Sequence, residues 1–426
     1  MDMRTKKLMK FLDSAHSVFH AVAGIANALE EAGYTCLQES TDWKLQSGGK
    51  YYLTRGGSAV IAFRVPAQPK GFLISASHAD RPTFKVKENG ELVGAYTRLA
   101  VERYGGMLMA PWLDRPLSVA GRVMVQTDKG IESRLVDIDR DLLMIPNVAI
   151  HMNRQANDGY KWNPASDLIP LLGGKDAAGK LNAMLEKAAG GKILGHDLYL
   201  YVRQKAAVWG ANKEYISAQA LDDLQCAWSC TQGFINAGTG DSIPVLCVFD
   251  SEEVGSGSYQ GAASDFLQSV LTRICQQLEM PYAQALAQSF LVSADNAHAL
   301  HPNHPELADA ANAPLPGKGI VIKYNANQRY TTDGVSAALM RKVCEKANVP
   351  VQTYCNRADM PGGSTLGNIS LTQVAVPSVD IGLAQFAMHS CYETASVADA
   401  IYLEQAMECY YGSTLEHAAD GVYDLK

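Results

Sequence analysis

Apolar residues recur along the chain with two alternating periods, which predicts an α/β fold. Residues 3–33 carry Val18, Val22, Ile25 and Leu29 at spacings of three and four, so we predict one helix that ends at Gly33. Residues 263–280 repeat this helical period. Short apolar runs lie between such segments and are typical of buried strands: 50–53, 59–64, 71–75, 245–249, 290–294, 319–323 and 373–381. The alternation predicts a mixed, mostly parallel sheet with helices on both faces.

The pattern of apolar residues changes between residues 85 and 212, where many short β-like pieces and glycine-rich turns replace the helical period. Two of these pieces are residues 121–126 and 147–152. We therefore predict a β-rich domain at 85–212, inserted between a first part (1–84) and a second part (213–426) of a larger α/β domain.

Composition narrows the class of protein. The chain has 426 residues, 47% apolar and 19% charged, and a net charge of −7, which disfavours general nucleic-acid binding. No apolar run reaches about 18 residues, so no membrane span is expected. Nine scattered cysteines with no CxxC pair argue against a disulfide framework. These features indicate a reduced, cytoplasmic protein of enzyme size.

Two adjacent carboxylates, Glu252 and Glu253, follow the apolar run 247–249 and precede a Gly/Ser turn. Neighbouring side chains at a strand end point in different directions, so one carboxylate can bind a metal while the other moves a proton. Taken alone, the pair also fits a solvated acidic loop before a helix, where Glu is favourable. Other polar residues at strand ends decide between these interpretations.

Six such residues suit a pair of divalent metal ions of the zinc type, because imidazole and carboxylate are zinc ligands and a carboxylate can bridge two ions. One spare Glu would then accept a proton from water and deliver it to a leaving amine. Cobalt and manganese accept the same ligands. The six residues are His78, Asp222, Glu252, Glu253, Asp295 and His389.

Nearly end to end, the chain resembles a bacterial member of the aspartyl aminopeptidase family of dinuclear-zinc exopeptidases. The order and spacing of several segments carry this resemblance. They are SHADRPTFK (77–85), DRPLSVAGR (114–122), LDDL (221–224), DSEEVGS (250–256), DNAHALHPN (295–303), NANQRY (325–330), GST (363–365) and MHS (388–390).

The resemblance implies a role for each site residue. One metal takes His78 and Asp295, the other takes Glu253 and His389, and Asp222 bridges the two. Glu252 is the general base and later the acid, and Asp80 supports His78. Lys323 and Tyr330 line the substrate pocket. His151 is lent to the active site of a neighbouring subunit.

The resemblance also implies a zinc exopeptidase-like fold, with two zinc ions per subunit and peptide substrates that begin with Asp or Glu. The inserted domain then serves dimerisation, and the dimers build a homo-oligomer, the tetrahedral dodecamer of the family. A basic residue in the pocket, Lys323, pairs naturally with an acidic first side chain. Without the resemblance, Lys323 also fits a solvated residue at a strand end.

Some positions depart from the family pattern. Ala220 and Tyr392 stand where the family commonly has Arg, and Asp223 replaces an Asn. None is an expected ligand, so these changes affect the expected substrate preference and not hydrolysis. His298, His301 and His304 are three apart, but two intervening prolines interrupt a common helical face, so we expect no further metal site there.

Two alternatives remain open from the sequence. The first is a catalytically silent homologue that acts as an assembly scaffold, although a scaffold does not need a general base such as Glu252. The second is a dinuclear deacylase or carboxypeptidase, because the residues of a dinuclear hydrolase do not identify the bond that is cleaved.

Overall fold

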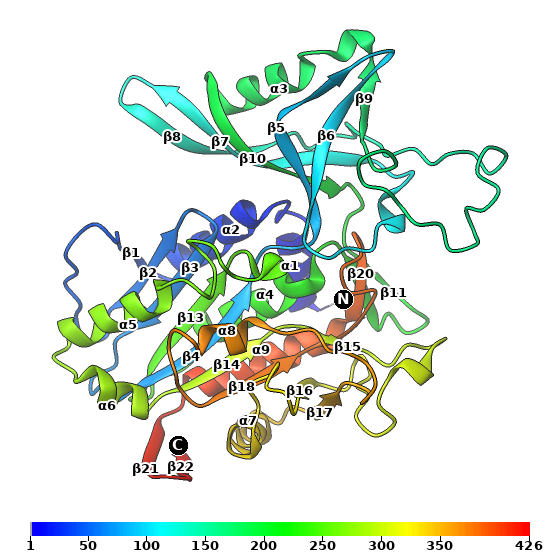
Figure 1. Ribbon diagram of the computed structural model, residues 1–426. Coiled ribbons are helices and arrows are strands. Elements are labelled where there is room, and N and C mark those ends of the chain that lie inside the picture. The colour runs from blue at the N-terminus through cyan, green and yellow to red at the C-terminus, as the bar shows by residue number, and fades with distance from the viewer. Residues whose placement is uncertain (1) are drawn as a thin grey trace.

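A nine-stranded sheet runs through the larger part of the molecule in the computed structural model, which describes residues 2–426 (Figure 1). Its strand order is β1-β2-β3-β13-β4-β14-β18-β16-β17, and the central strands β13, β4, β14 and β18 are parallel to one another. The strands are β1 (Thr35–Cys36), β2 (Lys50–Arg55), β3 (Ala59–Arg64), β4 (Phe72–His78), β13 (Ile243–Phe249), β14 (Phe290–Ala294), β16 (Ile320–Tyr324), β17 (Val351–Cys355) and β18 (Ser378–Gly382).

Helices cover both faces of this sheet and give it two hydrophobic cores, because side chains alternate along each strand. In β4, Phe72 and Ile74 enter one core and Leu73 enters the other. One face packs on α1 (Met3–Leu12), α2 (Val18–Glu31), α4 (Leu221–Asn236), α7 (Gly334–Lys346) and α9 (Val397–Tyr411). The other packs on α5 (Phe266–Gln277), α6 (Tyr282–Ala287) and α8 (Leu366–Ser370). The predicted sandwich of a mixed sheet between helices is confirmed.

The single helix predicted for residues 3–33 is wrong, because two helices occupy this range. Asp13 ends α1, and the Ser17 side chain accepts a hydrogen bond from the backbone N–H of His20 to cap α2. Ser and Asp satisfy the free backbone groups at helix ends, so the polar residues at 13–17 favour a break over continuation. The helical period of Val18, Val22, Ile25 and Leu29 belongs to α2 alone.

A second sheet of six strands, in the order β8-β7-β10-β5-β6-β9, stands above the main body in Figure 1. Every pairing in it is antiparallel, and α3 (Lys180–Ala189) packs on it over a separate hydrophobic core. We call it the β-rich unit. Its strands are β5 (Thr83–Val93), β6 (Tyr96–Tyr104), β7 (Leu117–Thr127), β8 (Gly130–Asp137), β9 (Leu171–Gly174) and β10 (Ile193–Val202).

The strand predicted for residues 147–152 does not form. These residues lie in the long loop between β8 and β9, where Val148, Ile150 and Met152 are exposed. An apolar run is a strand only where a neighbouring strand and a core receive it, and here neither is present.

Two smaller sheets complete the fold. The order of one is β11-β12-β20-β19-β15, and the other is the hairpin β21–β22. Their strands are β11 (Ala207–Trp209), β12 (Tyr215–Ala218), β15 (Ala297–His298), β19 (Ala384–Phe386), β20 (Glu393–Ser396), β21 (Leu415–Ala419) and β22 (Val422–Leu425). Within residues 2–426, no helix is both long and apolar enough to cross a membrane.

Candidate active site

The carboxyl ends of the central parallel strands bring four of the six polar residues together. His78 is the last residue of β4, and Phe249 at the end of β13 lies opposite it in register. Glu252 and Glu253 follow β13 in a short 3-10 turn, and Asp295 follows β14 directly. Parallel strands end at the same edge of a sheet, so the fold gathers these side chains there.

The other two residues reach this edge from elements beside the sheet. Asp222 lies at the start of α4, where it and Asp223 have non-helical backbone dihedrals. His389 lies between β19 and β20. His389 itself has a left-handed φ of +66°, as do Ala220 (+53°) and Ser251 (+64°) just before other site residues. Such conformations in non-glycine residues cost about 1–3 kcal/mol each and cluster at functional sites.

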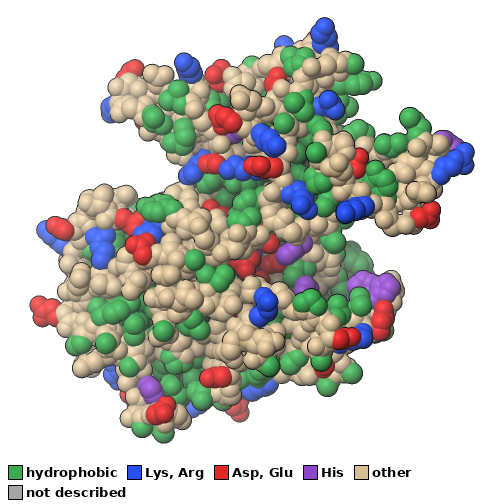
Figure 2. All heavy atoms as spheres, in the orientation of Figure 1, with side chains coloured by type: hydrophobic (Ala, Val, Ile, Leu, Met, Phe, Trp, Pro, Cys, Tyr) green, Lys and Arg blue, Asp and Glu red, His purple; other side chains and the backbone are tan. Residues whose placement is uncertain are grey.

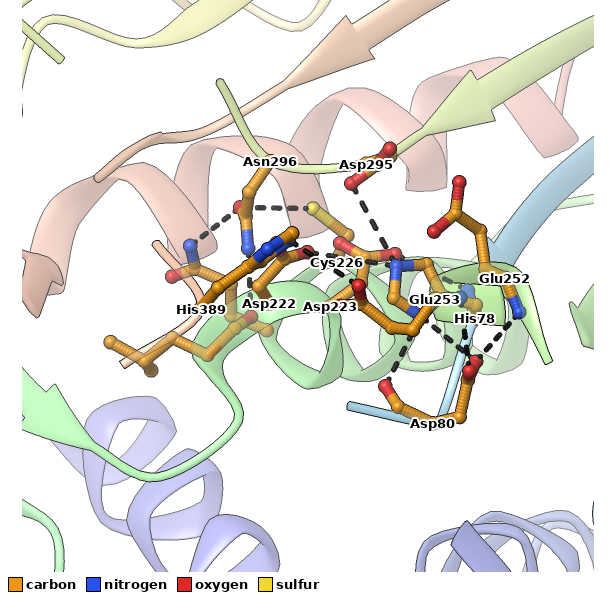
Figure 3. Close-up of polar contacts among 12 residues, drawn as sticks. His78, Asp80, Asp222, Asp223, Cys226, Glu252, Glu253, Asp295, Asn296 and His389 are labelled. Atoms are coloured by element: carbon orange, nitrogen blue, oxygen red, sulfur yellow. Dashed lines mark hydrogen bonds and ion pairs between the residues drawn. The ribbon is translucent and has the colours of Figure 1, made fainter. Parts of the chain in front are cut away.

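Asp222 stands at the centre of the cluster, with one carboxylate oxygen toward each histidine (Figure 3). His78 Nε2 lies 3.6 Å from Asp222 Oδ1 and 3.8 Å from Asp295 Oδ1. His389 Nε2 lies 3.5 Å from Asp222 Oδ2 and 3.4 Å from Glu253 Oε2. Two three-residue groups therefore share Asp222: His78–Asp222–Asp295 and Asp222–Glu253–His389.

The spacing and chemistry of these donors fit metal ions. Tetrahedral zinc with bonds of about 2.0–2.2 Å separates neighbouring ligand atoms by about 3.3–3.6 Å, close to the distances between the four pairs. Asp222 Oδ1 and Glu253 Oε1 are buried and have no hydrogen-bond partner among residues 2–426. Buried carboxylate oxygens without partners are costly, and a cation would satisfy them.

The pKa shifts of the carboxyl groups in the cluster also favour bound metal ions. Burial and nearby carboxylates raise the pKa of Glu253, and burial raises the pKa of Glu252 to about 8. Burial acts to raise the pKa of Asp222 as well, but the imidazoles of His389 and His78 outweigh it and lower that pKa. The cluster thus concentrates more negative charge than its own side chains neutralise, which bound cations would offset.

Glu252 differs from its neighbour in its surroundings. The backbone N–H groups of Glu252 and Glu253 both donate to Asp80, each at 3.1 Å. The Glu252 carboxylate forms no hydrogen bond with any other side chain of residues 2–426, and a carboxylate oxygen of it lies within 4.8 Å of ligand atoms of His78 and Glu253 (Figure 3). It is therefore free to exchange a proton beside the cluster.

Two buried carboxylates, those of Asp80 and Glu393, contact residues of the cluster and help to fix their positions. Asp80 Oδ1 lies 3.2 Å from His78 Nδ1, the ring nitrogen that faces away from the cluster. Glu393 accepts hydrogen bonds from the backbone N–H of Asp222 at 2.9 Å and of His389 at 2.7 Å. Glu393, four residues after His389 and the first residue of β20, was not predicted, because no feature of the sequence distinguishes it from a surface glutamate.

Lys323 and Tyr330 lie next to Asp295. Lys323 is 1% exposed, and its Nζ donates to the backbone carbonyls of Asp295 (2.8 Å) and Asn296 (3.2 Å). The Tyr330 ring centroid is 5.1 Å from this ammonium group. Burial acts to lower the pKa of Lys323, but Asp295 and other nearby groups outweigh it and raise that pKa, so the side chain is a buried cation. Lys323 is therefore not a solvated lysine at a strand end.

A cavity of about 310 Å³ is lined in part by Met388, the neighbour of His389 in the sequence. His298, His301 and His304 line it together with Tyr354 and Arg357. None of these residues was predicted as a substrate contact. Figure 2 shows acidic and histidine side chains exposed in the hollow between the main body and the β-rich unit. The cavity is large enough to receive a side chain beside the cluster.

His151 lies apart from the other site residues. It is exposed in the long loop between β8 and β9, which projects away from the main body (Figure 1). Among residues 2–426, no hydrogen bond or ion pair joins His151 to the cluster. Any contribution of this residue to an active site would have to be made to another subunit.

Comparison with known proteins agrees with this geometry. The sequence model described as aminopeptidase I zinc metalloprotease (M18) matches residues 11–411. The chain belongs to the M18 family. It is therefore a metal-dependent aminopeptidase, a hydrolase of peptide bonds, and the resemblance to aspartyl aminopeptidases fits this family.

Relatives of this M18 aminopeptidase match it over nearly their whole length. A probable M18 family aminopeptidase 2 of Clostridium acetobutylicum is 41% identical over 423 residues, covering 95% of this chain and 98% of the relative. Among solved structures, that of the Ape4 and Nbr1 complex has a TM-score of 0.93 at 33% identity and covers 96% of this chain and 85% of that one. The S. cerevisiae mApe1 dodecamer has a TM-score of 0.85 at 26% identity, with 96% of each chain covered. Family membership decides against the deacylase and carboxypeptidase alternatives.

Proposed function

We propose that this M18 aminopeptidase removes acidic N-terminal residues from peptides at a site built for two zinc ions. The observation that carries the proposal is the central position of Asp222, whose two oxygens face two different imidazoles. His78 and Asp295 would hold one ion, Glu253 and His389 the other, and Asp222 would bridge them. Zinc ions there would polarise the scissile carbonyl and lower the pKa of the attacking water.

The protein's own residues supply the remaining chemistry. Glu252 takes a proton from the attacking water and returns it to the nitrogen of the leaving peptide. Asp80 orients His78 through its second ring nitrogen, as carboxylates do for metal-bound histidines. The carboxylates of the cluster offer a counter-charge to the free ammonium group at the N-terminus of the substrate.

Lys323 supports a preference for Asp or Glu at the first position. An ammonium group has three donors, and two of those on Lys323 are used by the carbonyls of Asp295 and Asn296. Asp295 Oδ2 lies 3.8 Å from Nζ, too far for a hydrogen bond, so the third donor would bind a substrate carboxylate; Tyr330 flanks the same group. Pairing inside an enclosed pocket discriminates strongly against substrates that lack the partner charge.

Assembly completes the proposal. The β-rich unit would form the dimer contact and bring His151 of one subunit to the active site of its neighbour, within a homo-oligomer that is a dodecamer. A dodecameric neighbour, the mApe1 structure, supports this. All nine cysteines are unpaired, which supports a reducing, cytoplasmic location.

The test compares two isosteric changes at adjacent positions, Glu252→Gln and Glu253→Gln. Glu252→Gln should keep its zinc content and lose about 10²–10⁴-fold in turnover, because only the proton acceptor is removed. Glu253→Gln should lose zinc, since a ligand is removed. Zinc per subunit is measured by elemental analysis, and turnover with an aspartyl substrate. Turnover of Glu252→Gln within a few-fold of the unmodified enzyme would contradict the proposal.

A further inference from the structure

The segment that leaves β6 carries the chain from the β-rich unit to the cluster of carboxylates and histidines. We call residues 104–108 the exit segment. Tyr104 Oη donates a hydrogen bond to Asp80 Oδ2 at 2.8 Å. The Tyr104 ring meets the ring of Tyr199 on β10 edge-on, with centroids 5.6 Å apart at 80°. Tyr104 is thus held by the β-rich unit while its hydroxyl reaches the main body.

The Asp80 carboxylate also contacts three groups of the site. Its carboxylate accepts the backbone N–H groups of Glu252 and Glu253 and lies 3.2 Å from His78 Nδ1. Asp80 is 3% exposed, so protein groups and not solvent satisfy its oxygens. A hydroxyl that fixes the Asp80 carboxylate therefore also fixes the proposed base, one ligand and the ring of another.

Two further contacts of the exit segment reach proposed metal ligands directly. Gly105 has a φ of +76°, and a Cβ built on it would lie 3.1 Å from Glu253 Cβ and 3.2 Å from Glu253 O. The backbone N–H of Leu108 donates to the carbonyl oxygen of His389 at 3.0 Å. The exit segment thus lies against Glu253 on one side and His389 on the other.

We propose that the exit segment is a positioning element of the active site and that Tyr104 is a positioning residue for catalysis. Through it the β-rich unit sets the placement of Glu252, Glu253, His78 and His389. The roles of these four residues are those of the proposed function, on which the inference rests. The reaction centre is then assembled from both parts of the chain, even within one subunit.

The first experiment compares Tyr104→Phe with Tyr199→Phe in the full-length, assembled enzyme. Both changes remove one hydroxyl from the same pair of packed rings, but among residues 2–426 the Tyr199 hydroxyl has no hydrogen-bond partner. Tyr104→Phe should lower kcat about tenfold with KM within twofold, and weaken zinc binding about tenfold, as outer-shell changes do. Tyr199→Phe should leave all three unchanged. Equal kcat and zinc affinity in the two variants would overturn the inference.

The second experiment compares Gly105→Ala with Gly179→Ala. Gly179 has a φ of +74°, nearly that of Gly105, but an added Cβ there would meet nothing within 4 Å. Both variants place a Cβ at nearly the same positive φ, and only Gly105→Ala pushes on Glu253. Gly105→Ala should bind zinc at least tenfold more weakly than Gly179→Ala, measured by competition with a chromophoric chelator. Equal zinc affinities would count against the inference.

These outcomes separate the inference from the function it rests on. If Glu252→Gln loses turnover while Tyr104→Phe matches Tyr199→Phe, the inference fails and the proposed function stands. If Glu252→Gln retains turnover, the proposed function fails, whatever the tyrosine variants do.

Discussion

Glu393 offers a sharp test of how the cluster is held, because one side chain supports two proposed ligands. Its carboxylate oxygens accept the backbone N–H groups of Asp222 and His389 separately, and the residue is 1% exposed. In Glu393→Gln one of these oxygens becomes an NH₂ group that faces an N–H donor. One buried hydrogen bond to the carboxyl group is lost, and two donors are set against each other.

The size of the effect follows from the energy of such a bond. A buried donor that is left without a partner costs about 1–3 kcal/mol, and each 1.4 kcal/mol is a factor of ten. Because the lost bond anchors Asp222 or His389, we expect zinc affinity to fall about 10- to 100-fold. Turnover should fall at low zinc and recover when zinc is added in excess.

The assay is zinc competition with a chromophoric chelator, followed by kinetics over a range of zinc concentrations. Glu404→Gln is the matched control: Glu404 is 3% exposed on α9, and one of its carboxylate oxygens lies 3.6 Å from Arg4 and not near the cluster. It should change stability without changing zinc affinity. Zinc affinity in Glu393→Gln within twofold of that in Glu404→Gln would refute the reasoning.

Three further predictions concern specificity, assembly and pH. Lys323→Met should lower kcat/KM for aspartyl and glutamyl substrates at least about tenfold more than for leucyl substrates, because the charge partner is lost; an unchanged ratio would discard Lys323 as selector. His151→Ala should keep its zinc and lower kcat in the assembled oligomer, and unchanged kinetics there would contradict the cross-subunit role. Burial lowers the pKa of His20 from 6.5 to about 4, so the unfolded chain takes up this proton first as pH falls. Stability is then lost between pH 6.5 and 4, by up to about 3 kcal/mol. His20→Gln should show a shallower fall in melting temperature over this range, and equal slopes would count against the assignment.

The sequence predicted which residues meet at the strand ends better than it predicted the elements around them. His78, Glu252 and Asp295 are foreseeable because each follows an apolar run that can only be a buried strand, and parallel strands end together. His389 is less foreseeable, because only the short strand β19 precedes it. The break at residues 13–17 was missed because the helical period of α2 was extended backwards through polar residues that end helices.

Contacts between distant segments were not foreseeable. Tyr104 is an ordinary aromatic residue at the end of a strand, and only the fold brings its hydroxyl to Asp80. Likewise, Glu393 has no feature in the sequence that distinguishes it from a surface glutamate. Such residues act through burial and partners, which a linear pattern does not encode.

The alternation of side chains along β4 has a consequence for how this chain can vary in length. Phe72 and Ile74 face one core, Leu73 faces the other, and His78 closes the strand at the cluster. Inserting or deleting one residue in β4 would exchange the two core faces and also carry His78 away from Asp222. The packing of the two cores and the position of His78 thus depend on the same register of β4. Natural insertions are expected instead at exposed turns such as residues 128–129 between β7 and β8, where neither a core residue nor a proposed site residue lies.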